Sequence, residues 1–193
     1  MTKYILVGGY PWKAKDEGKA FYEEIAKGFT EPIRILICAF ARPQEEWDET
    51  LREDKEVFIK HLPAKKIDLK IAQPESFIDQ VKWAQAIFFR GGSTSQLLNL
   101  LKQYPEWINH IEGKTVAGTS AGADMVSKYF VELTAIKLDE GLGLLPIKVL
   151  VHYKSDYNAP RIDWDKAYKA LDRYKEKLQV VTLREGEYKV ISK

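Results

Sequence analysis

The sequence is poor in cysteine, histidine and long hydrophobic runs, and each shortage excludes a class of protein or a kind of site. The single cysteine, Cys38, excludes a disulfide framework and any zinc site built on several thiolates. The three histidines, His61, His110 and His152, are far apart in sequence and match no metal-ligand spacing. No apolar stretch reaches the roughly 20 residues of a membrane span. We therefore expect neither a metal nor another cofactor, and no membrane partner.

Charge of one sign is also scarce. Thirty basic residues stand against 28 acidic ones, and no strongly basic block is present. Nucleic-acid binding needs clustered positive charge, so we expect no such partner. The start, MTKYILVGGY, lacks the basic and apolar regions of a signal peptide, which favours a cytoplasmic protein. With no repeat, low-complexity tract or linker, residues 1–193 are expected to form one domain.

What the sequence does have is a repeated alternation of apolar, β-rich segments with amphipathic helical segments. The run 33–40 is nearly continuously apolar, as in a strand covered on both faces. The expected strands are 4–7, 33–40, 67–71, 86–89, 115–118, 130–136, 148–152, 180–183 and 188–191, and the expected helices are 16–27, 44–62, 74–83, 93–104, 121–129 and 164–178. This order predicts a single-domain α/β fold, with a mostly parallel sheet and helices on both faces.

The segment Gly118-Thr119-Ser120-Ala121-Gly122 lies between an expected strand and an expected helix. It matches G-x-S-x-G in the strand–turn–helix context of a nucleophile elbow. Glycines are needed because a side chain at either flank would collide with the neighbouring strand or the helix start. The turn would lift the Ser120 hydroxyl clear of the sheet, at the positive end of a helix. A turn needed only for packing is the alternative, and Ser120 is the expected nucleophile.

A second strand end carries Gly91-Gly92, followed by the start of a helix. Paired glycines let backbone N–H groups approach a ligand closely, and such groups stabilise a developing oxyanion. Beside a serine nucleophile, the N–H of the next residue, Ala121, is the expected partner donor. Alone, the glycine pair indicates a simple turn; next to the serine motif it predicts an oxyanion hole.

A serine nucleophile needs an adjacent base, and His152 is the candidate because it ends the expected strand 148–152. His61 and His110 fall on polar helix surfaces. An acid is also required to orient the imidazole. Our first choice is Glu132, which interrupts an apolar strand. Three other carboxylates between Ser120 and His152 remain open as alternatives: Asp124, Asp139 and Glu140.

Together these segments resemble the peptidase E family of serine peptidases, which includes aspartyl dipeptidase and, more distantly, cyanophycinase. The matching segments are 89–98, 118–123 and 141–153, with weaker echoes at 39–49 and 183–186. The resemblance implies a fold related to class I glutamine amidotransferases, with serine where those enzymes carry cysteine. It also implies the following site: Ser120 as nucleophile, His152 as base, and Gly91, Gly92 and Ala121 around the oxyanion.

The expected function is hydrolysis of a short peptide or similar amide through an acyl-enzyme on Ser120. A non-catalytic module that binds a small molecule or partner is one alternative, because Leu150-Val151 replaces the polar or proline-containing pair that precedes the family's histidine and because the acid of the triad is not settled. An esterase of the α/β-hydrolase type is the other, although Ser120 and His152 are close in sequence for that fold. The five tryptophans and ten tyrosines suit a core or a homodimer interface alike.

Overall fold

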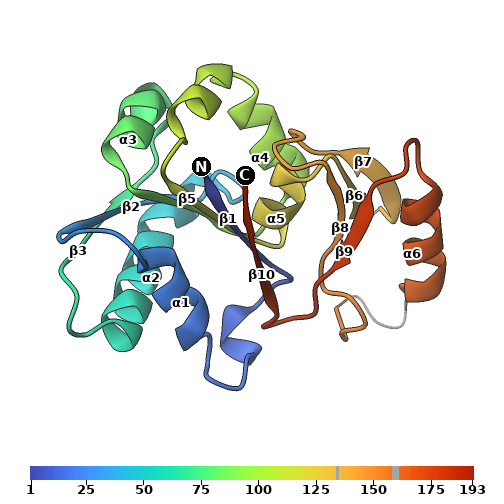
Figure 1. Cartoon of the computed structure of the whole chain (residues 1–193), viewed down its shortest axis with the longest axis horizontal. Coiled ribbons are helices and arrows are strands. Elements are labelled where there is room, and N and C mark those ends of the chain that lie inside the picture. The colour runs from blue at the N-terminus through green and yellow to red at the C-terminus, as the bar shows by residue number, and fades with distance from the viewer. Residues whose placement is uncertain (134, 158–160) are drawn as a thin grey trace.

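The computed structural model describes residues 1–133, 135–157 and 161–193, which form two β-sheets with helices packed around them (Figure 1). The first sheet has the strand order β10-β1-β5-β4-β2-β3. Its strands are β1 (Lys3–Val7), β2 (Ile33–Cys38), β3 (Ile67–Ile71), β4 (Ala86–Phe89), β5 (Thr115–Thr119) and β10 (Tyr188–Ser192). All its pairs are parallel except β1 with β10, which brings the two ends of the chain together. The expected mostly parallel sheet is therefore confirmed.

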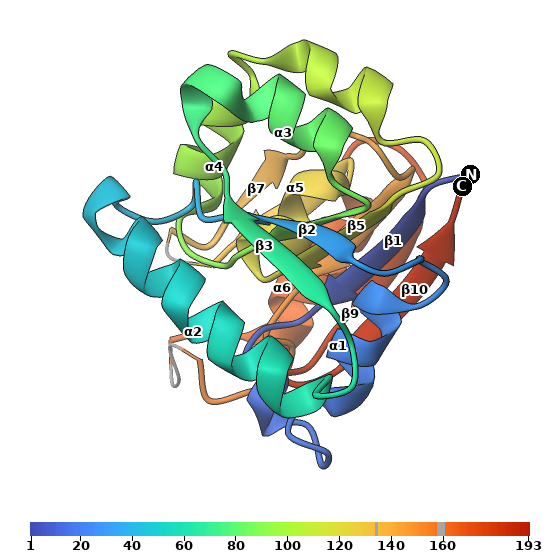
Figure 2. The ribbon, with the colours of Figure 1, turned by 90° about the vertical axis from the view of Figure 1, so that its left-hand side faces the viewer.

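Helices cover both faces of this sheet, as the continuous apolar strands predicted. On one face lie α1 (Lys19–Ala26) and α2 (Trp47–His61), and on the other lie α3 (Phe77–Trp83), α4 (Thr94–Leu101) and α5 (Ala121–Val126) (Figure 2). Side chains of β1 alternate between the two cores: Ile5 and Val7 join the first face, whereas Tyr4 and Leu6 join the second. Short 3₁₀ helices complete this part of the chain: η1 (Pro11–Lys13), η2 (Gln44–Glu46), η3 (Pro74–Ser76) and η4 (Pro105–His110).

The second sheet was not predicted as a separate sheet. Its order is β7-β6-β8-β9, from β6 (Tyr129–Glu132), β7 (Lys137–Glu140), β8 (Ile147–Leu150) and β9 (Gln179–Thr182), and α6 (Trp164–Arg173) packs against it. Sequence periodicity does not say which strands pair, so the second sheet was merged with the first. The strand β7 was missed because three of its four residues are charged. The two sheets share one hydrophobic core, which contains Leu6 of β1 and Phe130 of β6.

Several element ends also differ from the sequence prediction. The strand expected at 148–152 ends at Leu150, so His152 lies in the turn that follows. The helix expected at 121–129 ends at Val126, where the Ser127 hydroxyl donates a hydrogen bond to the Asp124 carbonyl at 2.7 Å. Residue 134, inside the expected strand 130–136, lies outside the described residues. Within the described ranges, no helix combines the length and apolar character needed to cross a membrane.

Candidate active site

Ser120 occupies the sharp turn between β5 and α5. Its backbone has φ 49° and ψ −108°, a positive φ that a residue other than glycine rarely adopts. The surrounding chain holds it there: its N–H donates to the Val7 carbonyl at 3.0 Å, and its carbonyl accepts from the N–H groups of Ala123 and Asp124. Because strain of this kind persists only where neighbours enforce it, the geometry indicates a functional turn. It is the elbow that the sequence predicted.

The two glycines of the elbow are enforced by crowding. A Cβ on Gly118 would lie 2.3 Å from the carbonyl carbon of Gly122, at the helix start. A Cβ on Gly122 would lie 2.5 Å from the carbonyl oxygen of Phe89, on the neighbouring strand β4. Both collisions are those that the sequence predicted. The elbow therefore needs glycine on each side of Ser120.

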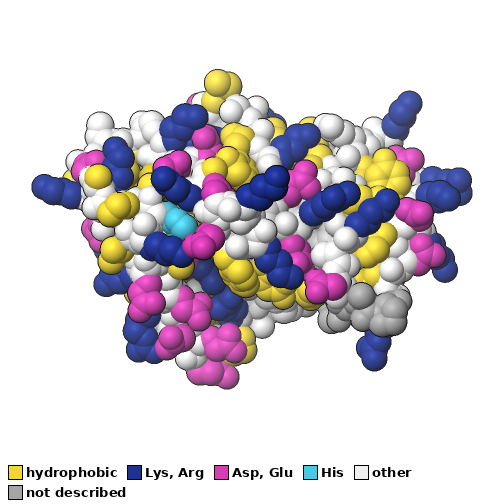
Figure 3. Space-filling model, turned by 90° about the horizontal axis from the view of Figure 1, so that it is seen from below, with side chains coloured by type: hydrophobic (Ala, Val, Ile, Leu, Met, Phe, Trp, Pro, Cys, Tyr) yellow, Lys and Arg dark blue, Asp and Glu magenta, His cyan; other side chains and the backbone are white. Residues whose placement is uncertain are grey.

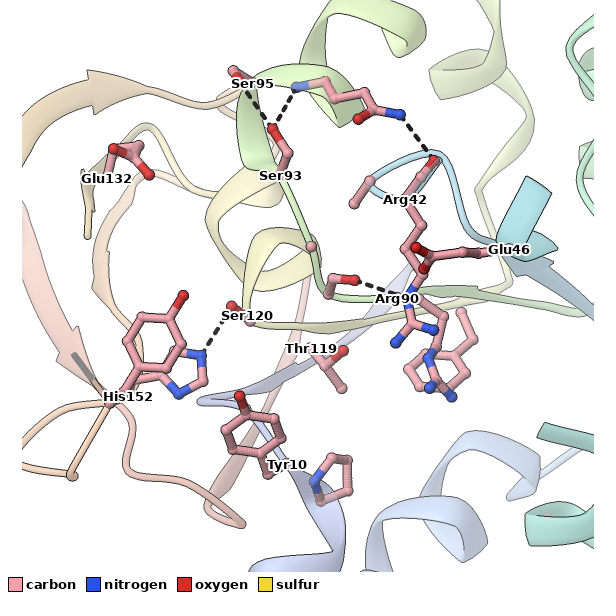
Figure 4. A pocket seen from close by; sticks show the side chains of 18 of the residues that line it. Tyr10, Arg42, Glu46, Arg90, Ser93, Ser95, Thr119, Ser120, Glu132 and His152 are labelled. Carbon is pink, nitrogen blue, oxygen red and sulfur yellow. Dashed lines mark hydrogen bonds between the residues drawn. The ribbon is translucent and has the colours of Figure 1, made fainter. Parts of the chain in front are cut away.

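His152 meets Ser120 from the second sheet. The turn after β8 gives His152 a φ of 53°, and its N–H donates to the Gly8 carbonyl at 2.8 Å, which ties it to the end of β1. Its Nε2 lies 3.0 Å from the Ser120 Oγ (Figure 4). The structure thus brings together the expected serine and histidine, from two different sheets.

The carboxylate beside His152 is Glu185, not the expected Glu132. The Oε1 of Glu185 lies 3.0 Å from Nδ1 of His152, while its other oxygen accepts from Lys13. Glu132 ends β6 and accepts the N–H of Ala135 at 2.6 Å. In Figure 4 it lies apart from the imidazole. The correction has a topological reason, because β8 and β9 are parallel neighbours and the residues after their ends come together.

The other carboxylates considered from the sequence are engaged elsewhere. Asp139 lies in β7 and accepts the N–H of Glu140, and Glu140 pairs with Lys175. Asp124 is buried in α5, where its Oδ2 accepts the hydroxyl of Thr94 at 3.3 Å. Burial raises the pKa of Asp124 well above its usual range, against the smaller effect of that hydrogen bond. The Asp124 side chain therefore favours its neutral, protonated form.

The pKa of the histidine reflects opposing influences. Burial lowers the pKa of His152, and the hydrogen bond and charge of Glu185 raise it, but burial prevails and the pKa lies below its ordinary value. For Glu185, burial favours the neutral acid, yet Lys13 and His152 together outweigh it and hold its pKa below the ordinary value. At neutral pH the site therefore contains a neutral imidazole beside an ionised carboxylate.

Ser120 lines a cavity of about 1070 Å³. Gly91 and Gly92 line it, and Gly91 is next to the nucleophile, since a Cβ on it would lie 3.3 Å from the Ser120 Cβ. Gly92 has φ 153°, and a Cβ there would be 2.3 Å from the Ala41 carbonyl oxygen. Ala121 is the first residue of α5, a position whose N–H has no partner within a helix. The three residues expected at the oxyanion thus lie around Ser120.

Two arginines form the far wall of the cavity, across from His152 (Figure 4). Arg90 pairs with Asp54, whose side chain is buried, and Arg42 donates through Nε to the Gly91 carbonyl at 3.2 Å. The Arg42 hydrogen bond holds the Gly91 carbonyl in place. Sequence reasoning missed both arginines, although Arg90 directly precedes the glycine pair. Among the described residues, no group of three or more His, Cys, Asp or Glu side chains is arranged to hold a metal.

A serine on a strained strand–turn–helix elbow, hydrogen-bonded to a histidine that also contacts a carboxylate, is the site of a serine hydrolase. Within that class, the family model of peptidase family S51 matches residues 6–192. The chain belongs to this family, the peptidase E family, and is a serine-type peptidase.

Solved structures agree with this fold. A peptidase from an acI-B1 Actinobacterium has a TM-score of 0.70 and 21% identity, over 99% of this chain and 83% of that one. A protein assigned to peptidase E from Listeria monocytogenes EGD-e has a TM-score of 0.70 and 17% identity, over 100% of this chain and 98% of that one. No curated protein sequence matches the chain.

Proposed function

We propose that this serine peptidase hydrolyses short peptides or similar amides through an acyl-enzyme on Ser120. In this mechanism His152 is the general base and Glu185 orients its ring. The observation that carries the proposal is the continuous hydrogen-bonded line from Ser120 Oγ to His152 Nε2 and from His152 Nδ1 to Glu185, with both distances 3.0 Å. Such a line lets the imidazole take the hydroxyl proton while the carboxylate stabilises the resulting positive charge.

The reaction has two halves. The Ser120 Oγ attacks the carbonyl carbon as its proton passes to Nε2 of His152, and a tetrahedral intermediate forms. The C–N bond then breaks as the imidazolium returns that proton to the leaving amine. In the second half, His152 takes a proton from water, the hydroxide attacks the ester carbonyl, and the acid product leaves as Ser120 regains its proton.

The negative oxygen of the intermediate needs hydrogen-bond donors that are already in place. The N–H groups of Gly91, Gly92 and Ala121 are the proposed donors, since the two glycines line the cavity beside Ser120 and Ala121 directly follows it at the start of α5. One such donor contributes about 3 kcal/mol to the stabilisation of a transition state. Close packing supports the proposal, because Gly92 against Ala41 and Gly91 against Ser120 hold the donors without a later rearrangement.

The Glu185 contact also bears on the alternative of a binding module without chemistry. That alternative depended partly on the lack of an identified acid. The Glu185 side chain is 6% exposed, and its carboxylate lies at Nδ1 of His152. This buried contact favours a working triad over a decayed site. The substitution of Leu150-Val151 for a polar pair is compatible with this, because both side chains are buried in the core rather than facing the cavity.

The test is hydrolysis of a mixed pool of dipeptides and tripeptides, followed by mass spectrometry. Ser120→Ala should reduce turnover by on the order of 10⁶-fold, the scale found when a serine nucleophile is removed. The control Ser192→Ala removes an exposed hydroxyl from β10 and should retain full activity. Intact-mass spectra of the quenched wild-type enzyme should show the added acyl group on Ser120.

Two results would contradict the proposal. Turnover retained in Ser120→Ala would exclude Ser120 as nucleophile. Absence of cleavage by the wild type, across the whole pool, would exclude short peptides as its substrates and favour the binding module.

A further inference from the structure

Aromatic side chains form a rim on the His152 side of the cavity. Tyr157 stacks on the imidazole, with ring centroids 4.1 Å apart and planes inclined by 15°. Tyr10 meets the same ring edge-on at 5.4 Å, and Trp12 packs against Tyr10 at 5.0 Å. All three rings line the cavity. We call these three residues, Tyr10, Trp12 and Tyr157, the aromatic rim.

Trp12 is unusual because it is 59% exposed. The other four tryptophans of the chain are buried or half-buried. The local backbone accounts for this exposure. Tyr10 adopts φ 42°, and Pro11 begins the short helix η1, in which Trp12 lies at the surface. Because Trp12 also lines the cavity, its exposed ring is available to contact a ligand there.

A second hollow, of about 310 Å³, lies on the other side of the rim. The three rim residues line it together with Lys13, Asp156 and Glu185. Ligand pockets occupy about 300–1,000 Å³, so this hollow has room for a side chain that passes over Trp12. The three rim residues thus line both this hollow and the main cavity. Figure 3 views the molecule from below, the side on which the segments after β1 and β8 lie in Figure 1, and shows hydrophobic side chains exposed among charges of both signs.

The proposed mechanism fixes which part of the substrate reaches this rim. The leaving nitrogen must lie within hydrogen-bond reach of Nε2 of His152, which returns the proton to it. The carbonyl oxygen lies on the opposite side, near Gly91 and Gly92. The leaving amine and its side chain therefore extend past the imidazole toward Tyr10, Trp12 and Tyr157, the rings that flank it.

We propose that the aromatic rim is the leaving-group subsite, and that the enzyme prefers peptides whose leaving amino acid carries an aromatic side chain. This inference rests on the proposed function, because the position of the leaving group follows from the role of His152. Tyr10 and Tyr157 contact the imidazole directly, whereas the Trp12 ring packs against Tyr10. Trp12 is therefore the specificity-determining residue that can be tested without disturbing the triad.

The test compares dipeptides Xaa–Phe and Xaa–Ala, with each of the twenty amino acids as Xaa, for the wild type and for Trp12→Ala. The wild type should show a higher kcat/KM for Xaa–Phe. Trp12→Ala should lower the Phe-to-Ala ratio by roughly 3- to 10-fold, the size of one aromatic stacking contact. Trp12→Phe should restore part of the ratio. The matched control is Tyr168→Ala, which removes a 37% exposed ring from α6 and should leave the ratio unchanged.

A binding measurement separates failure of this inference from failure of the proposed function. Calorimetry of phenylalaninamide and alaninamide with Ser120→Ala needs no turnover. Tighter binding of phenylalaninamide, lost in the Ser120→Ala/Trp12→Ala double variant, would support the subsite even if no dipeptide were cleaved. Equal binding of the two amides, or a Phe-to-Ala ratio that Trp12→Ala leaves unaltered, would overturn the aromatic subsite while leaving the serine mechanism intact.

Discussion

At the residue scale, the protonation state of His152 depends on two opposing effects, its burial and the charge of a neighbouring carboxylate. The ring is enclosed by Tyr10 and Tyr157, and this burial favours neutral imidazole. Glu185 acts in the opposite direction, because a carboxylate at Nδ1 stabilises imidazolium. Lys13, which contacts the same carboxylate, keeps Glu185 ionised. In the proposed mechanism, the imidazole is therefore neutral when it must accept the Ser120 proton, and the carboxylate is charged when imidazolium forms.

The pH dependence of hydrolysis follows from this balance. Only neutral His152 accepts the proton, so kcat/KM should fall as the pH drops through the pKa of His152. Because that pKa is lowered, the midpoint of the acidic limb should lie below about 6.5, the ordinary histidine value. Glu185→Gln removes the influence that raises the pKa. Its midpoint should therefore move to still lower pH, while kcat decreases by roughly 10²–10⁴-fold. A pH series of initial rates measures both effects.

Glu132→Gln is the matched comparison, since it makes the same change in the carboxylate first expected from the sequence. Its acidic limb should coincide with that of the wild type, and its kcat should decrease far less. If Glu132→Gln proved the more damaging of the two, the assignment of Glu185 as the orienting acid would be wrong.

The residues of the site differ in how well sequence predicts them. Ser120 could be predicted because its signal is local: two glycines, a preceding strand and a following helix. Glu185 could not, because its pairing with His152 depends on β8 and β9 being parallel neighbours, which no local pattern reveals. The sequence did carry one signal, because Glu185 follows an expected strand end and directly precedes a glycine, Gly186. Arg42 and Arg90 were missed because charged residues at strand ends are common.

At the element scale, the β5–α5 elbow depends on how closely the strand and the helix approach. The space between them admits no side chain at Gly118, whose added Cβ would overlap the backbone of Gly122. Gly118 is in β5 and its φ is not in the left-handed region, so substitution there tests crowding rather than backbone preference. The same elements were predictable as types, because apolar strands and amphipathic helices differ in period. Their ends were less predictable: β7 is mostly charged, and α5 ends where the Ser127 hydroxyl donates to the carbonyl of Asp124 in the last turn of the helix.

Gly118→Ala should therefore destabilise the protein and displace the nucleophile. Overpacking a tight backbone contact costs about 1–3 kcal/mol, and a shift of α5 would carry Ser120 with it. Urea unfolding should report the loss, and kcat should fall by about 10²-fold. Gly113→Ala is the control, because φ there is +74° but a Cβ would meet no atom within 4 Å. It should cost about 1 kcal/mol of backbone strain and leave kcat unchanged. Equal kcat in the two variants would mean that elbow packing does not position Ser120.

At the scale of the whole molecule, the active site is the junction of the two sheets. Ser120 follows β5 of the first sheet, whereas His152 and Glu185 follow β8 and β9 of the second. Gly8 and Gly9, just after β1, join the halves: the Gly8 carbonyl accepts the His152 N–H, and the Gly9 carbonyl accepts the Gly186 N–H. The geometry of the proposed Ser120–His152–Glu185 triad therefore depends on how the two sheets pack together. Sequence reasoning that assumed one sheet could place each candidate at a strand end but could not say which ends meet.

Gly9→Ala tests this junction most directly. A Cβ at position 9 would lie 2.2 Å from Cε1 of His152, and the φ of +131° disfavours any side chain. The imidazole must move away from Ser120 to relieve the contact, and a displacement near 1 Å costs about 10²-fold in rate. We expect kcat to fall by at least that factor, and urea unfolding to show a loss of about 1–3 kcal/mol. The control Gly28→Ala, with φ +90° and no atom within 4 Å of the added Cβ, should lose about 1 kcal/mol but no activity. Should Gly9→Ala retain full kcat, the imidazole would not be held by the close approach of the two sheets, and the Gly8 hydrogen bond to His152 would remain as the contact that positions it.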